Sequence, residues 1–559
     1  MSRYLLSISI GPVQDFIVAA RRTRDFWYGS WLLSEISKAA ANELDAVGAE
    51  LIFPASLTNN DLLPDSDFTA TNKILAIIPE NILPEDAFQR AEKAAIDRFF
   101  SEADKVFEQI CKYINPERWE NQIRDILEIY GAWVPEEGIM SRKLVERLLA
   151  GRKALRNFEQ GQGEPRIPKS SLDGLRESVL KSKPHDSHLP MLKIRPGEQL
   201  DSIGFIKRLG GGTKSYPSVA RVALDPWVRK VASDNSLKTK KAFEELIKIS
   251  SHISSLPQIR EPQYSLFPYE GTVCYVSRHE EVFSRENVSL KSRIQQVLSD
   301  LPTPSPYMGV LMADGDKMGA ALDSLNSFAE IKEVSLALSE FAKEAKKVIT
   351  NHYGCLVYAG GDDVLAFVPL DKCLIIARDL YDLFGNIVGN KIKMEKTTLS
   401  VGIAICHFLE PLGDILQRAR LAEKEAKSPD RNGLAISLYK RSGGAALSFR
   451  SSWEKNPDQD IEAWLELFAS NQLPSKAAYE LYELADFYQR SKEIELPIEA
   501  LEKDALRILE RKDIKKSAVP IVEKLLLQSI KNADEFKSRV EVMLFAEHLS
   551  QALIAKDGR

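Results

Sequence analysis

Short apolar runs alternate with longer amphipathic stretches over much of the chain. Residues 308–313 form one apolar run, a helical pattern follows over 327–352, and a second apolar run covers 357–367. Two glycines and two aspartates at 360–363 interrupt the second run. Short apolar runs are typical of buried strands, and a Gly-rich interruption between two of them is typical of a tight hairpin turn. The pattern therefore predicts a strand, a helix and a two-stranded hairpin.

Carboxylates stand where two of these predicted elements end. Asp362 and Asp363 occupy the hairpin tip, Asp314 follows the first strand, and Asp316 comes two residues later. A βαβ unit of this size brings the end of the first strand beside the hairpin, so Asp314 is expected near the hairpin tip. Adjacent carboxylates repel each other unless cations neutralise them. We therefore predict a site for two Mg²⁺ or Mn²⁺ ions, with phosphoryl transfer as its chemistry.

Glycines beside these carboxylates fit the same prediction. Gly360 and Gly361 permit the tight turn and leave room for a nucleotide to approach the backbone. Beyond Gly315, backbone N–H groups would bind phosphate where the next helix starts. The expected catalytic residues are Asp314, Asp362 and Asp363, and Asp316 is expected as a further metal ligand or as support for the others.

The order of strand, Asp-Gly-Asp, helix and Gly-Gly-Asp-Asp hairpin resembles the palm domain shared by nucleotidyl cyclases, diguanylate cyclases and some polymerases. Other segments make the chain similar to the large palm-bearing subunit of type III-B CRISPR effector complexes. These segments are 8–17, 20–25, 29–30, 207–210, 216–220 and 225–227. The resemblance extends over most of residues 1–440.

This resemblance implies a function and a set of partners. It implies ATP as substrate and a cyclic, 3′–5′ linked oligoadenylate as product, made when the complex binds target RNA. Other subunits, a guide RNA and the target RNA would be the partners. Lys427 matches a helix-terminal lysine that reaches the triphosphate in palm cyclases, and the helix dipole also favours a lysine there. Two alternatives stay open: a stand-alone diguanylate or adenylate cyclase, and an inert scaffold subunit.

A degenerate internal repeat indicates a second palm domain. Residues 4–10 and the helix after them parallel 308–313 and its helix, and 51–54 and 73–78 would be the paired hairpin strands. The first copy has Gly-Pro-Val-Gln at 11–14 in place of the Asp-Gly-Asp motif, so it is not expected to bind metals in the same way. The alternative is the general likeness of any two ferredoxin-like folds.

The expected fold class is α/β (α+β), with two ferredoxin-like palm domains, a mostly helical middle domain and a C-terminal helical bundle. The expected boundaries are 1–135 for the degenerate palm, 136–305 for the middle domain and connector, 306–442 for the catalytic palm and 443–559 for the bundle. The bundle would contact other subunits, as the resemblance implies.

Composition restricts the class of protein further. The chain has 559 residues, 44% hydrophobic and 28% charged, which is ordinary for a soluble globular protein, and its net charge of −5 argues against nucleic-acid binding by the whole surface. No signal peptide and no apolar run of about 18 residues is evident, so a cytoplasmic protein without membrane contact is expected. Five scattered cysteines form no Cys-x-x-Cys pair, which predicts no structural zinc.

Two polar stretches carry further hypotheses. Relatives often begin with an HD-type nuclease domain, which we do not find in this sequence, and the pair His185 and Asp186 is expected in a solvated loop. Residues 141–156 carry six basic side chains against one acidic side chain. Basic residues at helical spacing either follow a phosphate backbone or form a solvated helix face, and the sequence favours neither.

Overall fold

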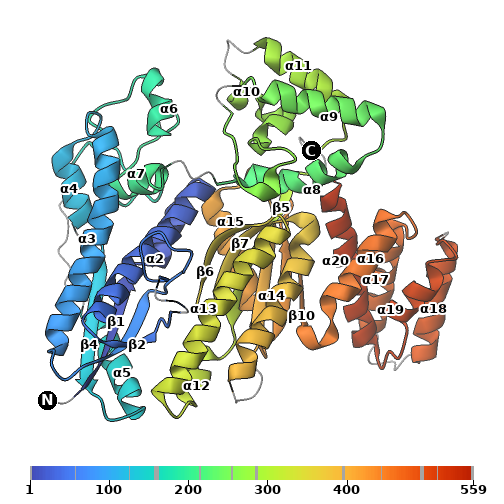
Figure 1. The fold of residues 1–559 in the computed structure, drawn as a ribbon. Helices are drawn as coiled ribbons and strands as arrows, with labels where there is room; N and C mark the ends of the chain where they lie inside the picture. Colours follow the sequence, from blue (N-terminus) through green and yellow to red (C-terminus); the bar gives the residue numbers. More distant parts are fainter. Residues whose placement is uncertain are drawn as a thin grey trace.

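The structure is a computed structural model of the chain. It describes residues 3–56, 58, 60–124, 126–155, 163–212, 216–253, 256–283, 288–392, 397–441, 443–490, 497–512 and 514–554. Two β-sheets lie side by side, each flanked by long helices, with a mainly helical region above them and further helices toward the C-terminal end (Figure 1). This mixed α/β architecture confirms the predicted fold class.

The N-terminal sheet is antiparallel and has the strand order β2-β3-β1-β4. Its strands are β1 (Tyr4–Gly11), β2 (Glu50–Phe53), β3 (Lys73–Ile78) and β4 (Glu128–Pro135). The helices around it are α1 (Gln14–Val18), α2 (Thr23–Ala46), α3 (Pro84–Ile110), α4 (Pro116–Arg124) and α5 (Met140–Ala154). Helix α5 packs on β4 and β1, although it follows the boundary expected at residue 135.

The second sheet has the strand order β10-β9-β8-β5-β7-β6, and only the β8–β9 pair is parallel among these strands. Its strands are β5 (Tyr307–Gly315), β6 (Cys355–Gly360), β7 (Asp363–Pro369), β8 (Leu399–His407), β9 (Gly433–Leu438) and β10 (Leu447–Ser452). The helices of this domain are α12 (Met318–Asp323), α13 (Phe328–Asn351), α14 (Cys373–Ile387) and α15 (Leu412–Ala426).

The two sheets share one topology. The order β2-β3-β1-β4 in the first corresponds to β6-β7-β5-β8 in the second. In each, a long helix follows the first strand (α2 and α13) and another follows the third strand (α3 and α14). The two domains therefore have the shared strand order and helix placement that the predicted internal repeat requires, and that two ferredoxin-like folds would also share.

Strand β8 is buried along its whole length because α14 and α15 both pack on it. Burial on both faces explains why this segment is continuously apolar rather than alternating. A side chain at Gly402 would place its Cβ only 2.1 Å from the backbone nitrogen of Glu423, so glycine is needed for α15 to lie this close to the sheet. This contact fixes the helix that ends beside Lys427.

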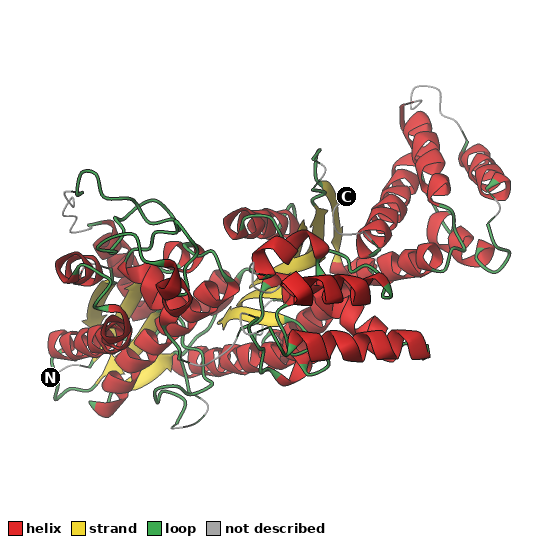
Figure 2. Ribbon diagram, turned by 90° about the horizontal axis from the view of Figure 1, so that it is seen from above, coloured by secondary structure: helices red, strands yellow, loops and turns green. Residues whose placement is uncertain are grey.

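The remaining regions are helical. Between the sheets in sequence lie α6 (Leu189–Leu192), α7 (Ser202–Leu209), α8 (Val219–Ser233), α9 (Leu237–Ser250), α10 (His279–Val282) and α11 (Val288–Ser299). After them come α16 (Pro457–Ala469), α17 (Ser475–Arg490), α18 (Ile498–Arg511), α19 (Val519–Leu526) and α20 (Ala533–Leu553). Figure 2 shows these last helices at the opposite end of the molecule from the N-terminal sheet. Within the described ranges, none of the helices combines the length and apolarity that spanning a bilayer requires.

The two sheet domains contact each other reciprocally. Helix α2 of the first packs against β6 of the second, and α13 of the second packs against β2 of the first. The backbone nitrogen of Ala55 donates to Ser335 Oγ over 2.8 Å, and Ser339 Oγ donates to the carbonyl of Ala55 over 3.2 Å. These reciprocal contacts set the two repeats face to face.

Candidate active site

The hairpin between β6 and β7 presents the Gly-Gly-Asp-Asp sequence at its tip. Gly360 pairs with Asp363, which leaves Gly361 and Asp362 as the two turn residues. Gly361 has φ +66°, a left-handed conformation that glycine adopts without strain. A Cβ on Gly361 would lie 3.5 Å from Thr71 Cγ2, so the tip faces the β2–β3 connection of the N-terminal domain.

Strand pairing brings Asp314 to this tip. Ala313 of β5 pairs with Val364 of β7, so Asp314, the next residue of β5, lies beside Asp363, the first residue of β7. The Asp314 side chain lies close enough to Asp363 to raise the pKa of that carboxyl. A Cβ on Gly315 would lie only 2.7 Å from Asp362 Cβ, so glycine at this position is what allows Asp362 to approach. Three carboxylates predicted to converge are thus brought together.

Like charges dominate the electrostatics of this carboxylate group. Burial and the charge of Asp314 raise the pKa of Asp362 to about 6. Burial, the charge of Asp362 and the nearby Asp314 side chain raise the pKa of Asp363 to about 8. Asp363 still reaches solvent, so the direction of its shift follows chiefly from the neighbouring carboxylates. A cation placed among these groups would reverse both shifts.

Lys427 supplies one positive charge at the site. It follows the last residue of α15, and its Nζ lies 2.8 Å from Asp314 Oδ1 and 2.5 Å from Glu423 Oε1. Burial lowers the pKa of Lys427, but hydrogen bonds to Asp314 and Glu423 outweigh that effect and raise it. The side chain is therefore a protonated ammonium held against the edge of the site.

Asp316 lies in a different environment from the other carboxylates. It is buried, and it accepts hydrogen bonds from Thr398 Oγ1 (2.7 Å), Ser400 Oγ (2.8 Å) and the backbone nitrogen of Asn432 (3.0 Å). The guanidinium of Arg431 lies 3.6 Å from Asp316 Oδ1. Both carboxylate oxygens of Asp316 accept hydrogen bonds from the protein. Asp316 therefore stabilises the 427–433 loop.

That loop needs support because Arg431 and Asn432 both have left-handed backbones, with φ +61° and +47°. Replacing Asp316 by Ala should lower the melting temperature by several degrees, since each buried donor left without an acceptor costs about 1–3 kcal/mol. Differential scanning fluorimetry would measure the shift, with Asp430→Ala in the same loop as the control, because Asp430 is exposed. Equal melting temperatures for the two variants would contradict the supporting role.

The donor set fits divalent cations bound together with a substrate. Among the described residues no three His, Cys, Asp or Glu side chains enclose a single point as a metal cage would. Mg²⁺ in nucleotide enzymes keeps several waters and is held by one or two carboxylates plus substrate phosphates, so a protein cage is not required. Asp314, Asp362 and Asp363 supply such carboxylates, and their mutual repulsion favours a cation between them.

Sequence reasoning missed several residues of this site. Glu423 stands one helical turn before Lys427, and this i, i+4 spacing was the available signal. Tyr358 covers the turn, because a Cβ on Gly360 would lie 2.3 Å from its hydroxyl oxygen. The donors to Asp316 are Thr398, Ser400 and Asn432, which lie 82, 84 and 116 residues away in sequence and carried no signal.

The residues of two other sequence hypotheses lie outside this site. His185 and His188 are in a short exposed turn, where His185 Nδ1 lies 2.9 Å from Ser187 Oγ. In the basic stretch, Arg142 is buried and bonded to Glu146 (3.1 Å) and Asp323 (2.9 Å). The exposed members of that stretch are Lys143, Arg147, Arg152 and Lys153, and Arg156 lies outside the described residues.

Comparisons with known proteins match both sheet domains. Residues 307–435 match the family model of the Cas10/Cmr2 second palm domain, and residues 5–120 match that of the N-terminal region of CRISPR-associated protein Cmr2. The Cmr subunit Cmr2 of Pyrococcus furiosus is 28% identical over 283 residues, covering 45% of this chain and 32% of that protein. The match thus spans about a third of the curated relative.

Solved structures agree on the fold. A type III-B Cmr-beta structure in the apo state aligns with a TM-score of 0.63 at 14% identity, covering 98% of this chain and 82% of the other. A Cmr-beta structure bound to cognate target RNA aligns with a TM-score of 0.64 at 13% identity, covering 98% and 83%. The second sheet, with its acidic hairpin, is thus a palm domain of the nucleotidyl cyclase and polymerase type. Both sheet domains thus match domains of the Cas10/Cmr2 family.

Proposed function

We propose that this chain is the nucleotidyltransferase subunit of a type III-B CRISPR effector complex, and that it converts ATP into a cyclic, 3′–5′ linked oligoadenylate. The observation that carries the proposal is the convergence of Asp314, Asp362 and Asp363 at one edge of the palm sheet. The match of residues 307–435 to the Cas10/Cmr2 second palm domain supports the same conclusion.

In this proposal the carboxylates and Lys427 have separate roles. Asp314, Asp362 and Asp363 would hold two Mg²⁺ or Mn²⁺ ions. Bound there, divalent ions lower the pKa of a ribose 3′-hydroxyl and neutralise charge on the α-phosphate and the leaving pyrophosphate. Lys427 would exchange its ion pair with Asp314 for an oxygen of the triphosphate. Gly361 would leave the tip of the turn open to the nucleotide, while Tyr358 covers Gly360, and no protein nucleophile is needed.

The proposed partners are the other subunits of the complex, a guide RNA and the target RNA. The support is the likeness to a Cmr-beta structure bound to cognate target RNA, together with the match of residues 5–120 to the N-terminal region of Cmr2. Because the two palm domains contact each other face to face, those partners could control the position of one palm relative to the other. A small change at the α2–β6 or α13–β2 contact would shift the hairpin tip relative to the first palm.

Replacing Lys427 by Ala should lower kcat/KM for ATP by about 10- to 100-fold, mainly through a higher KM, because the ammonium would bind the triphosphate. Steady-state pyrophosphate release measures this effect. Lys424→Ala is the matched control, since Lys424 is an exposed lysine on the same helix. A KM unchanged from that of the control would remove the phosphate role from Lys427.

The proposed activity is tested by offering the complex ATP and GTP separately, with Mg²⁺ and matching target RNA. Pyrophosphate release and product formation should require ATP, the metal and the target RNA together. Consumption of GTP to give a diguanylate product, without any need for RNA, would identify a stand-alone cyclase instead. Absence of turnover with either nucleotide in an intact complex would identify an inert scaffold subunit.

A further inference from the structure

A group of charged side chains gathers at the start of α2, far along the chain from the palm carboxylates. We call it the basic cluster. Its cations are Arg22 and Arg24 from α2, Lys193 and Arg195 from the loop after α6, and Arg208 from α7. Its carboxylates are Asp25 and Glu198. Among the described residues, the cations of this group outnumber its carboxylates.

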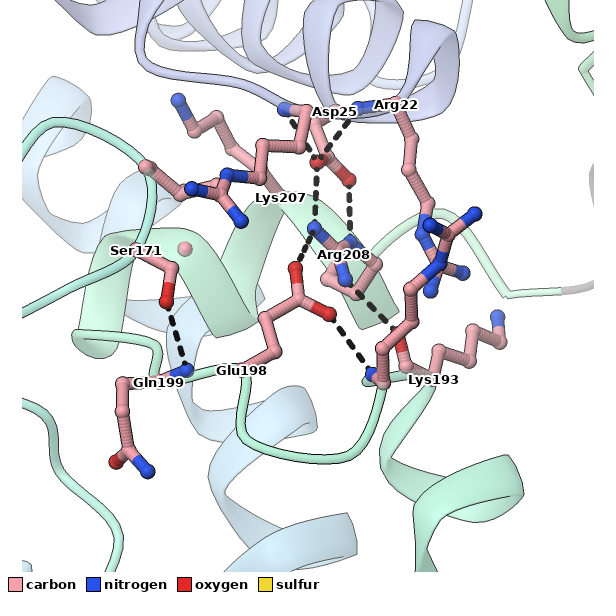
Figure 3. Close-up of polar contacts among 12 residues, drawn as sticks. Arg22, Asp25, Ser171, Lys193, Glu198, Gln199, Lys207 and Arg208 are labelled. Carbon is pink, nitrogen blue, oxygen red and sulfur yellow. Dashed lines mark hydrogen bonds and ion pairs between the residues drawn. The ribbon is translucent and has the colours of Figure 1, made fainter.

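Arg208 binds both carboxylates of the cluster. Its Nε and Nη2 donate to the two oxygens of Asp25 over 2.8 and 2.9 Å, and Nη2 also donates to Glu198 over 3.1 Å (Figure 3). Its Nη1 donates to the carbonyl of Lys193 over 2.8 Å. Arg208 is fully buried, so this set of bonds ties the 193–198 loop to α2 and is structural.

Arg22 and Lys193 are the two cations of the cluster that lack a bonded partner among the described residues. Within the part of the chain that is described, neither the Arg22 guanidinium nor the Lys193 ammonium forms an ion pair or hydrogen bond with a protein group. Both side chains are half-buried. Burial and then the Arg208 charge lower the pKa of Arg22 to about 10, and burial and then the Arg24 and Arg22 charges lower the pKa of Lys193 to about 8.

Half-buried cations that repel one another cost free energy of folding, so a structural role does not explain them. An anion bound between them would offset that cost. Phosphate suits the site, because a guanidinium binds two phosphate oxygens at once and an ammonium adds a point charge. We propose that the basic cluster is a phosphate-binding site, with Arg22 and Lys193 as its principal ligands.

The phosphate would come from the backbone of a single-stranded nucleic acid or from a free nucleotide. The site includes none of the palm carboxylates, so this inference does not rest on the proposed nucleotidyltransferase activity. The helix that begins at the basic cluster, α2, does contact the second palm. Phe26, in the first turn of α2, contacts Phe367 of β7 with ring centroids 6.4 Å apart. A ligand at the start of α2 would therefore touch the helix that joins the two palms.

The test uses the full chain in EDTA, so that metal-dependent nucleotide binding at the palm is suppressed. A 5′-labelled 20-nucleotide single-stranded RNA is titrated by fluorescence anisotropy at several salt concentrations, and unlabelled ATP is titrated in parallel by calorimetry. The variant is Arg22→Gln with Lys193→Gln. The matched control is Lys503→Gln with Lys516→Gln, two exposed lysines of the C-terminal helices that give the same change in net charge.

We expect the cluster variant to bind one of the two probes at least 5-fold more weakly than the control does. If RNA is the ligand, the salt slope should also fall by about 1, since each phosphate contact on a single strand contributes about 0.7. If only RNA binding is lost, the ligand is the backbone of a single-stranded nucleic acid. If only ATP binding is lost, the ligand is a free nucleotide.

The melting temperature distinguishes this proposal from a structural role. Removing two unpaired cations should leave the melting temperature of the variant unchanged or higher, because it relieves repulsion with Arg208. Affinities for RNA and ATP equal to those of the control would overturn the proposal. A fall of several degrees in melting temperature would also overturn it, since the two side chains would then be stabilising the fold.

Discussion

Asp362→Asn combined with Asp363→Asn should reduce oligoadenylate synthesis by roughly 1,000-fold or more and leave the protein folded. The two carboxylates stand at a hairpin tip where they repel each other and Asp314, so they contribute no net stability of their own. Removing their charges would remove the groups that hold the catalytic cations. Product formation by the purified complex measures the effect.

The same variant should change the pH dependence of stability. A carboxyl group whose native pKa is raised stabilises the protein fully below its unfolded pKa, about 4, and loses that contribution as pH rises through the native pKa. For Asp362 and Asp363 the loss begins near pH 4 and is complete at about pH 6 and about pH 8 respectively. The wild-type melting temperature in EDTA should therefore decline between about pH 4 and about pH 8 more steeply than that of the double variant.

A divalent cation should reverse this difference. At pH 8, Mn²⁺ should raise the melting temperature of the wild-type chain and leave that of the double variant unchanged. Asp97→Asn with Asp104→Asn is the control, because both residues are exposed on α3 and the charge change is the same. Wild-type rates from the Asp362/Asp363 variant would refute the catalytic assignment, and insoluble protein would assign the hairpin a structural role.

Assembly with partner subunits and target RNA should raise the rate of ATP turnover by about 100-fold over that of the isolated chain. The proposed site lies between a palm with three carboxylates and a palm without them, so the rate depends on how the two palms are placed. A misplacement of about 1 Å in a reacting group can cost roughly 100-fold. Partners would act by shifting a pre-existing equilibrium between placements.

Pyrophosphate release should be compared for the chain alone, the assembled complex and the complex with matching target RNA. A complex with mismatched RNA serves as the control for non-specific stimulation. The chain alone should bind ATP weakly and form little product. Equal rates in all three states would describe a constitutive cyclase, and the regulated role in a CRISPR complex would be withdrawn.

The sequence predicted the local features of the palm because each had a local pattern. Hydrophobic runs marked β5, β6 and β7, the paired glycines marked the turn, and chain connectivity predicted that Asp314 would meet the hairpin. Lys427 was chosen through the resemblance to palm cyclases rather than through a local pattern, and the structure puts it 2.8 Å from Asp314. Periodicity and connectivity are short-range signals, so these predictions needed no knowledge of distant contacts.

The roles that the sequence did not show depend on distant contacts. Asp316 follows Asp314 closely, yet its backbone nitrogen donates to the carbonyl of Thr398 over 2.8 Å, and its side chain turns beneath β8. Arg142 looked like one member of a basic helix face, but Asp323, 181 residues away, pairs with it. The basic cluster likewise joins residues of α2 to a loop about 170 positions later, and no spacing rule connects them.

The most direct test of the central claim is mass spectrometry of the products made from ATP by the assembled complex with Mg²⁺ and matching target RNA. The account predicts a series of cyclic oligoadenylates from the wild-type complex, with no such product from the complex carrying Asp362→Asn and Asp363→Asn. Nuclease digestion should show 3′–5′ linkages. Oligoadenylate of the same size and amount from both complexes would contradict the assignment of the palm carboxylates as the catalytic centre.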